Sequence, residues 1–441
     1  MVFSSLAFLC LFLPIFLALY YAFPKLRTVT LAACSLFFYA YGEPRWILAL
    51  LFSGAAGYGC ALFIERFRGS RRAKGALLLS LLWNLGLLCR LKFTGLALPL
   101  GVSFYTFRMI SYTVDVYRGN AAPSRSPVKF LAYVTMFPLI ISGPIARYAD
   151  LEGDFGGRRL NARLFADGVT RFCVGLAKKV LLADAARRAL GVLFYPNAKW
   201  SFLGSWLGVA FFAFQLYFDF SGYSDMAIGL GKMLGFEFKE NFNYPYIADS
   251  ITDYWRRWHI SLSSFFRDYV YIPLGGNRRH QIFNLLAVWV LTGLWHGTGW
   301  NFVLWGLYNA AILIAEKYIL KSVLEKLPAA LRHVYALILI LFSRGLFYFT
   351  DAARLTAFVK AAVGVGVPLY DFRVQSVFLS NVFLLAALVI GATPLTARLA
   401  ARLRGRRLSA VLEPVCNVVL LALCFTAIVG QTYSPFLYAQ F

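Results

Sequence analysis

His296 is the residue whose type and setting best fit chemistry. It lies in the stretch TGLWHGTGW (292–300), within an apolar run long enough to cross a bilayer, and no acidic residue lies within ten positions of it. Exclusion from water favours the neutral imidazole, which can accept a proton near neutral pH. His296 is therefore a candidate general base.

Small and aromatic residues surround this histidine in the sequence. Glycines at 293, 297 and 299 remove side-chain bulk, which permits close backbone approach or a channel for a ligand. The tryptophans expected to wall such a channel are Trp289, Trp295, Trp300 and Trp305. The pattern by itself leaves open a structural hydrogen bond to a neighbouring helix and a proton relay in a transporter.

Other chemistries find little support in the residue pattern. The remaining histidines are His259, His280 and His333, and the last two follow arginines at expected membrane edges, where solvation is expected. No zinc-type histidine spacing, Walker loop, GxGxxG or serine nucleophile elbow occurs. The seven cysteines lack CxxC spacing and indicate neither a metal site nor a disulfide framework. Base-assisted attack by a substrate hydroxyl on an activated acyl group remains open.

The elements that must position these residues are membrane helices. The chain has 441 residues, of which 60% are hydrophobic and 15% charged, with a mean hydropathy of +0.65. These values lie outside the range of soluble domains. Apolar stretches of roughly 17–25 residues, enough to cross the hydrocarbon as helix, recur from end to end. We expect an all-α polytopic membrane protein with one integral membrane domain over residues 1–441.

The candidate spans follow from hydropathy. The first apolar run lacks the basic n-region and cleavage site of a signal peptide, so we interpret it as a retained helix. The candidates are residues 3–23, 28–41, 46–64, 75–91, 97–114, 129–147, 200–217, 283–298, 300–319, 332–349, 376–396 and 411–430, with weaker ones near 168–190, 219–236 and 356–368.

The formal net charge of +24 reflects topology. Lysines and arginines form short clusters between apolar runs, as at 25–27, 66–74, 118–129 and 402–407, and do not line one polar face. The positive-inside rule places these clusters in the cytoplasm and both termini outside. We therefore expect no nucleic-acid partner.

Residues 211–279 mix aromatic and charged side chains too densely to face lipid, which predicts re-entrant or interfacial helices around a cavity. The S-x-x-D pattern at Ser250 predicts a helix start, and apolar residues at helical spacing predict an amphipathic helix ending near Pro273. His259 lies at the border of its two faces. An alternative interpretation of this helix is an interfacial membrane anchor. The turn at 273–279 could bind a phosphate or be an ordinary basic turn.

Several stretches together resemble the membrane-bound O-acyltransferase superfamily, and within it the bacterial branch that includes the membrane proteins of alginate O-acetylation and teichoic-acid D-alanylation. The resemblance covers about residues 90–350 and the C-terminal tail. The stretches are FPLIISGPIARY (137–148), FDFSGYSDMAIGLGKMLGFEFKENFNYPY (218–246), TDYWRRWHISLSSFFRDYVYIPLGGNRR (252–279), LTGLWHGTGWNFVLWGLYNA (291–310) and FLYAQF (436–441).

The resemblance implies a multi-helix funnel with a central tunnel. It makes His296 the catalytic histidine at the waist of that tunnel and His259 the second motif residue. Asn309 departs from the pattern, because related bacterial members often have a histidine there, and we expect it to have a polar packing role. The residues expected at the tunnel or substrate are Trp295, Gly297, Trp300, Asn309, Asp219, Ser221, Tyr223, Asp225, Trp255, Arg256, Arg257 and Trp258. The two arginines fit contacts to a donor's phosphates or interfacial anchoring.

The resemblance also implies a function. We expect an O-acyltransferase that moves an acyl group, in the first place acetyl, from a cytoplasmic donor to hydroxyls of a secreted or cell-surface polysaccharide. Alternatives are D-alanyl transfer to teichoic acid from a carrier protein and a proton-coupled transporter or export channel. We expect no tightly bound cofactor or metal, and a donor that is acetyl-CoA or an acyl-carrier thioester. The expected partners are an extracytoplasmic SGNH-type acetyltransferase or the polysaccharide itself, with lipid of the cytoplasmic (inner) membrane around the protein.

Overall fold

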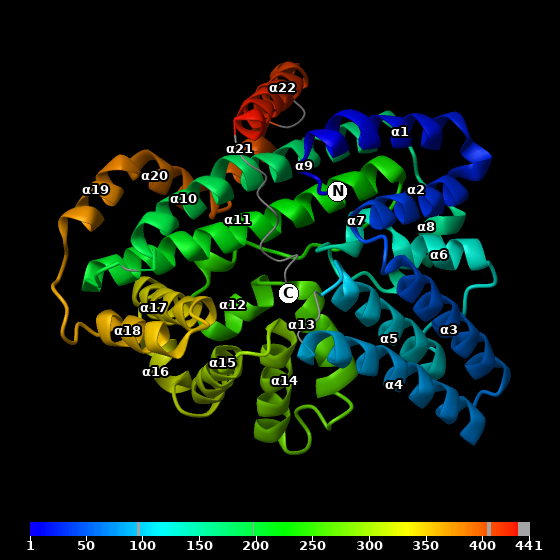
Figure 1. The fold of residues 1–441 in the computed structure, drawn as a ribbon, viewed down its shortest axis with the longest axis horizontal. Coiled ribbons are helices and arrows are strands. Elements are labelled where there is room, and N and C mark those ends of the chain that lie inside the picture. Colours follow the sequence, from blue (N-terminus) through cyan, green and yellow to red (C-terminus); the bar gives the residue numbers. More distant parts are fainter. Residues whose placement is uncertain (95–97, 197, 404–406, 431–441) are drawn as a thin grey trace. The chain divides into compact units, whose positions relative to one another are not determined.

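The computed structural model describes residues 1–94, 98–196, 198–403 and 407–430. Within these ranges every regular element is a helix (Figure 1). The all-α prediction is therefore confirmed. The FLYAQF stretch at 436–441 lies outside the described residues.

The chain forms two compact units, each assembled from separate stretches of sequence. Unit 1 comprises Met1–Leu176, Gly222–Glu240 and Asn417–Phe441, and unit 2 comprises Ala177–Ser221 and Asn241–Cys416. Helices α11 (Phe202–Leu234) and α22 (Arg407–Val429) contribute several residues to each unit.

Unit 1 consists mainly of the N-terminal helices. Glycines let α9 approach the unit-1 part of α11. A Cβ on Gly168 would lie 2.6 Å from the Gly229 carbonyl oxygen, and a Cβ on Gly229 would lie 2.6 Å from the Gly168 carbonyl oxygen, so neither position has room for a larger residue. The helices are η1 (Ala7–Phe12), α1 (Leu13–Ala22), η2 (Pro24–Leu26), α2 (Arg27–Gly42), α3 (Ile47–Arg66), α4 (Arg71–Phe93), α5 (Val102–Arg118), α6 (Pro127–Thr135), α7 (Phe137–Ile140), α8 (Tyr148–Gly156) and α9 (Ala162–Ala177).

Unit 2 contains His259 and His296, the two motif histidines. Its helices, besides the first part of α11, are η3 (Lys178–Ala183), α10 (Asp184–Leu193), η4 (Pro245–Ile247), α12 (Ile251–Arg257), α13 (Ile260–Phe266), η5 (Arg267–Tyr271), α14 (Gln281–His296), α15 (Trp300–Tyr318), α16 (Lys321–Lys326), α17 (Ala329–Tyr348), α18 (Ala352–Ala362), α19 (Phe372–Ser380), α20 (Val382–Gly391) and α21 (Leu395–Leu403).

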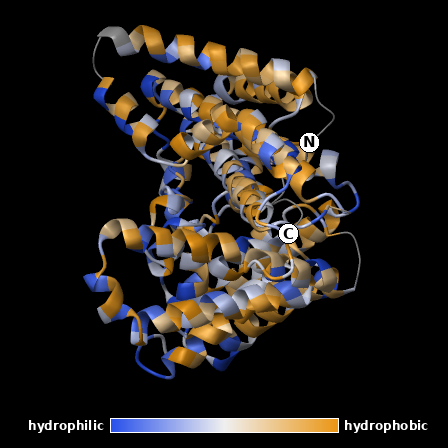
Figure 2. Cartoon of the chain, turned by 90° about the vertical axis from the view of Figure 1, so that its left-hand side faces the viewer, coloured by the Kyte–Doolittle hydropathy of each residue, from blue (hydrophilic) through white to orange (hydrophobic). Residues whose placement is uncertain are grey.

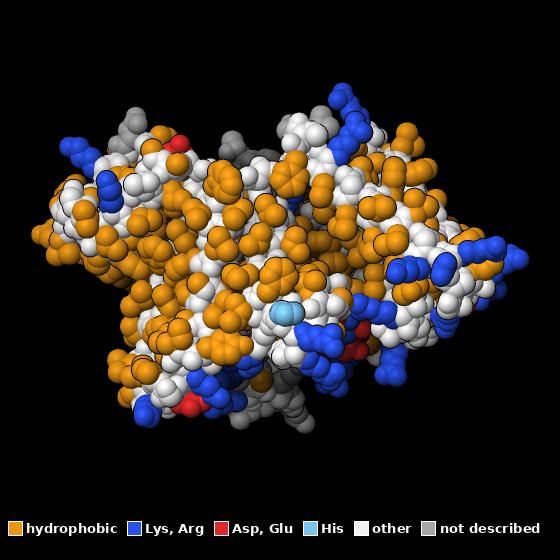
Figure 3. Space-filling view, turned by 90° about the horizontal axis from the view of Figure 1, so that it is seen from below, with side chains coloured by type: hydrophobic (Ala, Val, Ile, Leu, Met, Phe, Trp, Pro, Cys, Tyr) orange, Lys and Arg blue, Asp and Glu red, His pale blue; other side chains and the backbone are white. Residues whose placement is uncertain are grey.

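Five helices in the described part of the chain, α3, α4, α11, α17 and α22, are long and apolar enough to cross a bilayer. Two bent pairs raise the number to seven: η1–α1 with η2–α2, bent by 109°, and α19 with α20, bent by 62°. Apolar residues dominate the helices in Figure 2, and hydrophobic side chains cover much of the face in Figure 3, where acidic groups are few. The chain is a polytopic membrane protein, as expected.

Some predicted spans differ from the helices observed. The two segments predicted at 200–217 and 219–236 are joined in the single helix α11, and the segment predicted at 376–396 is broken at Asn381. The 129–147 segment ends as a helix at Thr135, because Pro138 in the next short helix cannot continue a helical hydrogen-bond ladder. Hydropathy reports burial in lipid and does not report such breaks.

Candidate active site

The α12 helix begins where the sequence predicts. The Ser250 hydroxyl oxygen accepts a hydrogen bond from the Asp253 N–H at 3.1 Å, which caps the helix. The prediction of one helix continuing to Pro273 is wrong, because α12 ends at Arg257 and His259 has a left-handed backbone with φ of +44°. The break between α12 and α13 therefore places the His259 side chain.

A buried carboxylate holds the first turn of α12. Glu316 on α15 accepts hydrogen bonds from the Ile251 N–H at 2.7 Å, the Thr252 N–H at 2.8 Å and the Thr252 hydroxyl at 2.6 Å. A negative charge is favourable there, because unpaired N–H groups give a helix start a partial positive charge. Sequence reasoning missed Glu316, which is 65 positions from Ile251.

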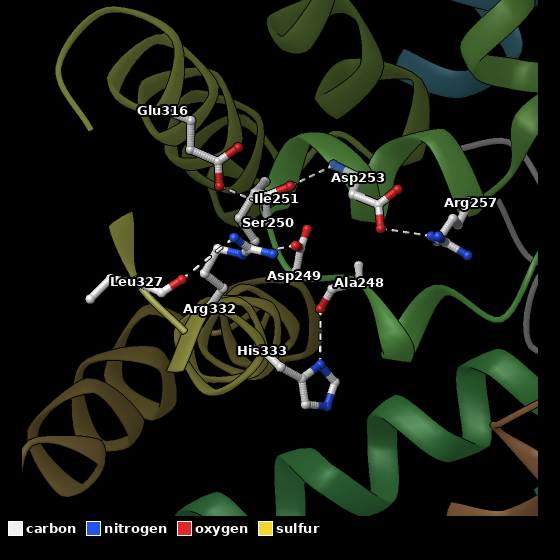
Figure 4. A network of polar contacts seen from close by, with 10 residues as sticks. All are labelled: Ala248, Asp249, Ser250, Ile251, Asp253, Arg257, Glu316, Leu327, Arg332 and His333. Carbon is white, nitrogen blue, oxygen red and sulfur yellow. Dashed lines mark hydrogen bonds and ion pairs between the residues drawn. The ribbon is translucent and has the colours of Figure 1, made fainter. Parts of the chain in front are cut away.

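Helix α17 holds the segment before α12 (Figure 4). Arg332 forms an ion pair with Asp249 at 2.9 Å, and the His333 Nδ1 lies 3.0 Å from the Ala248 carbonyl oxygen. His333 was expected to be solvated, but it is part-buried and has this backbone contact. Figure 4 shows these groups and Glu316 arranged around the start of α12.

His296 is the last residue of α14 and is enclosed by aromatic rings. Its side chain is buried, and its ring meets those of Trp305 and Phe347 edge-to-face, with centroids 5.1 Å away in both cases. The Trp295 ring lies 4.5 Å away. Of the predicted tryptophan wall, Trp295 and Trp305 contact the imidazole, while Trp300 is 81% exposed and is not part of this buried shell.

The glycines near His296 serve close packing. A Cβ on Gly293 would lie 2.3 Å from the Phe302 carbonyl oxygen, so α14 and α15 approach through this position. A Cβ on Gly297 would lie 2.1 Å from the Phe302 ring. Of the two roles open from the sequence, the structure favours close approach over a channel at these positions.

His259 is buried in the same aromatic cluster. Its ring meets Phe220 edge-to-face at 4.7 Å and lies 6.2 Å from Trp295, the tryptophan next to His296. Burial lowers the pKa of His259 to about 3, so this imidazole is neutral at neutral pH. The fold thus brings the two motif histidines to one tryptophan, although 37 positions separate them in the sequence.

Asn309 links helices through its side-chain amide. Its oxygen accepts a hydrogen bond from the Trp255 indole N–H at 3.2 Å, and its nitrogen donates to the Trp305 carbonyl at 2.8 Å and to the Ser343 hydroxyl at 3.2 Å. An uncharged amide can make all three bonds, so this role of Asn309 requires no titratable group. They join α12, α15 and α17 around the aromatic cluster.

An arginine that was not a predicted site residue contacts the RRWH segment (residues 256–259) and the helix before it. Arg344 on α17 is buried, its guanidinium carbon lies 4.3 Å from the centre of the Trp258 ring, and it donates a hydrogen bond to the Tyr254 hydroxyl. Cation–π contacts of this kind are stronger when desolvated. Its position inside an apolar run was the signal that could have identified it, because charges within spans are generally functional or paired.

The two predicted arginines differ in their surroundings. Arg257 forms an ion pair with Asp253 at 2.7 Å and donates to the Asn243 carbonyl at 3.3 Å. Arg256 is exposed. Arg256 is therefore the better placed of the two to meet a ligand.

The four predicted polar residues of α11 have separate surroundings. Asp219 and Ser221 are buried in unit 2, where Asp219 pairs with Lys179 at 2.8 Å. In unit 1, Tyr223 stacks on Phe3 with ring centres 4.7 Å apart, and Asp225 pairs with Arg171 at 2.6 Å. Lys179 also pairs with Asp184 at 2.9 Å, which makes a buried triad of one cation and two carboxylates.

The site offers acid–base groups and hydrogen-bonding groups. Among the described residues, no group of three or more His, Cys, Asp or Glu side chains is arranged to hold a metal ion. The arrangement can supply proton transfer by buried imidazoles inside an aromatic enclosure.

Comparison with known proteins supports the resemblance seen in the motifs. The model of the membrane-bound O-acyltransferase family matches residues 79–359. A protein of Azotobacter vinelandii named "Probable alginate O-acetylase AlgI" is 40% identical over 77% of this chain and 74% of its own length. A peptidoglycan O-acetyltransferase of Helicobacter pylori is 35% identical over 72% of this chain and 70% of its length, and a teichoic acid D-alanyltransferase of Bacillus subtilis is 29% identical over 50% and 59%.

Proposed function

Because the chain belongs to the membrane-bound O-acyltransferase family, we propose that it transfers an acetyl group from a cytoplasmic thioester to hydroxyls of a secreted or cell-surface polysaccharide. Membership of this family makes the chain a membrane O-acyltransferase. The names of the two relatives cited at 35% identity or more support acetyl as the acyl group and a polysaccharide as the acceptor.

The observation that carries the mechanism is the buried His296 imidazole at the end of α14. In our proposal it removes the proton of the acceptor hydroxyl while the hydroxyl oxygen bonds to the acyl carbonyl carbon. The carbon–sulfur bond then breaks, and the imidazolium returns the proton to the leaving thiolate. Proton transfer by a positioned side chain typically contributes about 10² to 10⁴-fold to a rate.

The same proposal assigns supporting roles to the surroundings of His296. His259 is a second buried imidazole, and its ring also lies near Trp295. Exposed Arg256 would meet the phosphates of the donor, and the basic loops would lie in the cytoplasm with both termini outside. An extracytoplasmic SGNH-type protein or the polysaccharide itself would receive the acetyl group.

The test compares surface polymers from cells that lack the protein with those from cells producing wild type, His296→Gln or His280→Asn. O-linked acyl groups are released by mild base and identified by mass spectrometry. We expect acetate with wild type and with His280→Asn, which removes an exposed histidine, and none with His296→Gln at equal protein abundance in membranes.

Three other outcomes would reject the mechanism, reject the function or identify a different acyl group. Near-normal acetylation by His296→Gln would reject the base mechanism, and polymers unchanged by loss of the protein would reject the function. Release of D-alanine in place of acetate would establish the alternative, which rests on a relative matching only half of this chain.

A further inference from the structure

Asn241 is fully buried in the segment between α11 and η4, and three donors converge on its side-chain oxygen. These are the Ser261 N–H at 3.1 Å, the Ser261 hydroxyl at 2.9 Å and the His259 Nδ1 at 3.1 Å. The backbone carbonyl of Asn241 also accepts the Ile260 N–H at 3.0 Å. Asn241 therefore satisfies the first backbone donors of α13 and touches the imidazole that precedes them.

This pattern determines which nitrogen of His259 carries hydrogen. A backbone N–H can only donate, so the amide atom facing Ser261 must be the oxygen. That oxygen can only accept, so the His259 Nδ1 must be the donor. A neutral imidazole has one N–H, and its lone pair is therefore on Nε2.

The same contacts account for the unusual backbone at His259. A non-glycine residue with φ of +44° is uncommon, because its Cβ comes close to the following carbonyl oxygen. Hydrogen bonds that Asn241 accepts from His259, Ile260 and Ser261 offset the cost of this conformation, and the Phe220 ring packs edge-to-face against the imidazole. The ring is thus fixed in both position and tautomer.

We propose that Asn241 is a positioning residue for acyl transfer, which fixes the Nδ1–H tautomer of His259 and so leaves the Nε2 lone pair as a second proton acceptor, in addition to His296. The role in transfer rests on the proposed function. The tautomer itself does not, and it can be measured without activity.

The first experiment is solid-state ¹⁵N NMR of histidine-labelled protein in lipid at neutral pH, with His259 identified by subtraction of the His259→Asn spectrum. Protonated and lone-pair imidazole nitrogens have well-separated shifts. We expect an Nδ1–H signal in wild type and in Asn241→Asp, whose carboxylate still accepts from all three donors. Hydrogen on Nε2 of wild-type His259 would overturn the proposal, and the only variant that this result needs is the His259→Asn reference.

The second experiment measures transfer rates. Asn241→Leu should lower the rate about 10²-fold or more, the lower end of what positioned proton transfer contributes, and should lose the uniform Nδ1–H signal. Asn241→Asp should restore most of the rate. Ser261→Ala is the matched control, because it removes one donor to the same oxygen and keeps the imidazole contact, and it should retain the wild-type tautomer with a rate within a few-fold.

Failure of this inference is distinguishable from failure of the proposed function. If His296→Gln abolishes transfer but Asn241→Leu keeps the wild-type rate or the wild-type spectrum, the positioning role falls and the function stands. If His296→Gln retains transfer, the proposed mechanism falls, and the spectra still decide the tautomer.

Discussion

Replacement of Glu316 by glutamine tests whether the α15 carboxylate organises the RRWH segment. The carboxylate accepts hydrogen bonds from two backbone N–H groups and one hydroxyl of the first turn of α12, all at 2.8 Å or less. Glutamine has the same shape but only one accepting oxygen. Whichever way its amide turns, at least one backbone N–H at the helix start loses its acceptor.

The magnitude follows from the number and type of these bonds. A hydrogen bond to a charged group contributes about 1.5–3 kcal/mol, and a buried donor left unsatisfied costs about 1–3 kcal/mol. We therefore expect Glu316→Gln to lower the free energy of unfolding by about 2–3 kcal/mol. Acyl transfer should fall as well, because α12 leads directly into His259.

The assay is denaturant unfolding in lipid bicelles, followed by tryptophan fluorescence. Glu325→Gln, the same substitution at an exposed position of α16, should stay within about 0.5 kcal/mol of wild type. Tyr335→Phe removes only the weaker 3.3 Å contact to Glu316 and should cost about 1 kcal/mol or less. If Glu316→Gln unfolds like Glu325→Gln, the carboxylate does not hold α12.

Three further predictions concern stability. Burial lowers the pKa of His259 to about 3, whereas the unfolded chain takes up the histidine proton near pH 6.5. As the pH falls from 6.5 to 3, the free energy of unfolding should therefore decrease by up to about 1.4 kcal/mol per pH unit. The unfolding midpoint of His259→Asn should depend less on pH than that of wild type, and equal slopes would contradict this. Gly293→Ala should have a much lower thermal unfolding midpoint than Gly86→Ala. The new methyl at 293 would lie 2.3 Å from the Phe302 carbonyl oxygen, whereas a methyl at 86 would have nothing within 4 Å. Similar midpoints would refute the close approach of α14 and α15. Lys179→Met should cost about 3–5 kcal/mol in chemical denaturation, since it leaves two buried carboxylates without their cation, and a neutral effect would show that they are not charged together.

Local sequence determined the fold class and the choice of candidate residues for the chemistry. Apolar length predicts membrane helices because hydrocarbon requires every backbone hydrogen bond to close within the segment. The start of α12 at Ser250 is likewise a local event, because the capping oxygen and the N–H it binds are three residues apart. The choice of His296 as a candidate base needed only its apolar neighbours and the glycines on either side of it.

Tertiary structure decided how those residues are held. The helix pattern continues through His259, yet the chain turns there, because Asn241 takes the N–H groups that a continuous helix would have paired internally. Glu316 and Arg344 act on α12 from 64 to 90 positions away. Periodicity within one segment carries no information about such partners. The neighbourhood of the two histidines is therefore a property of the packed helices, in which buried polar groups must find acceptors and donors wherever the fold brings them.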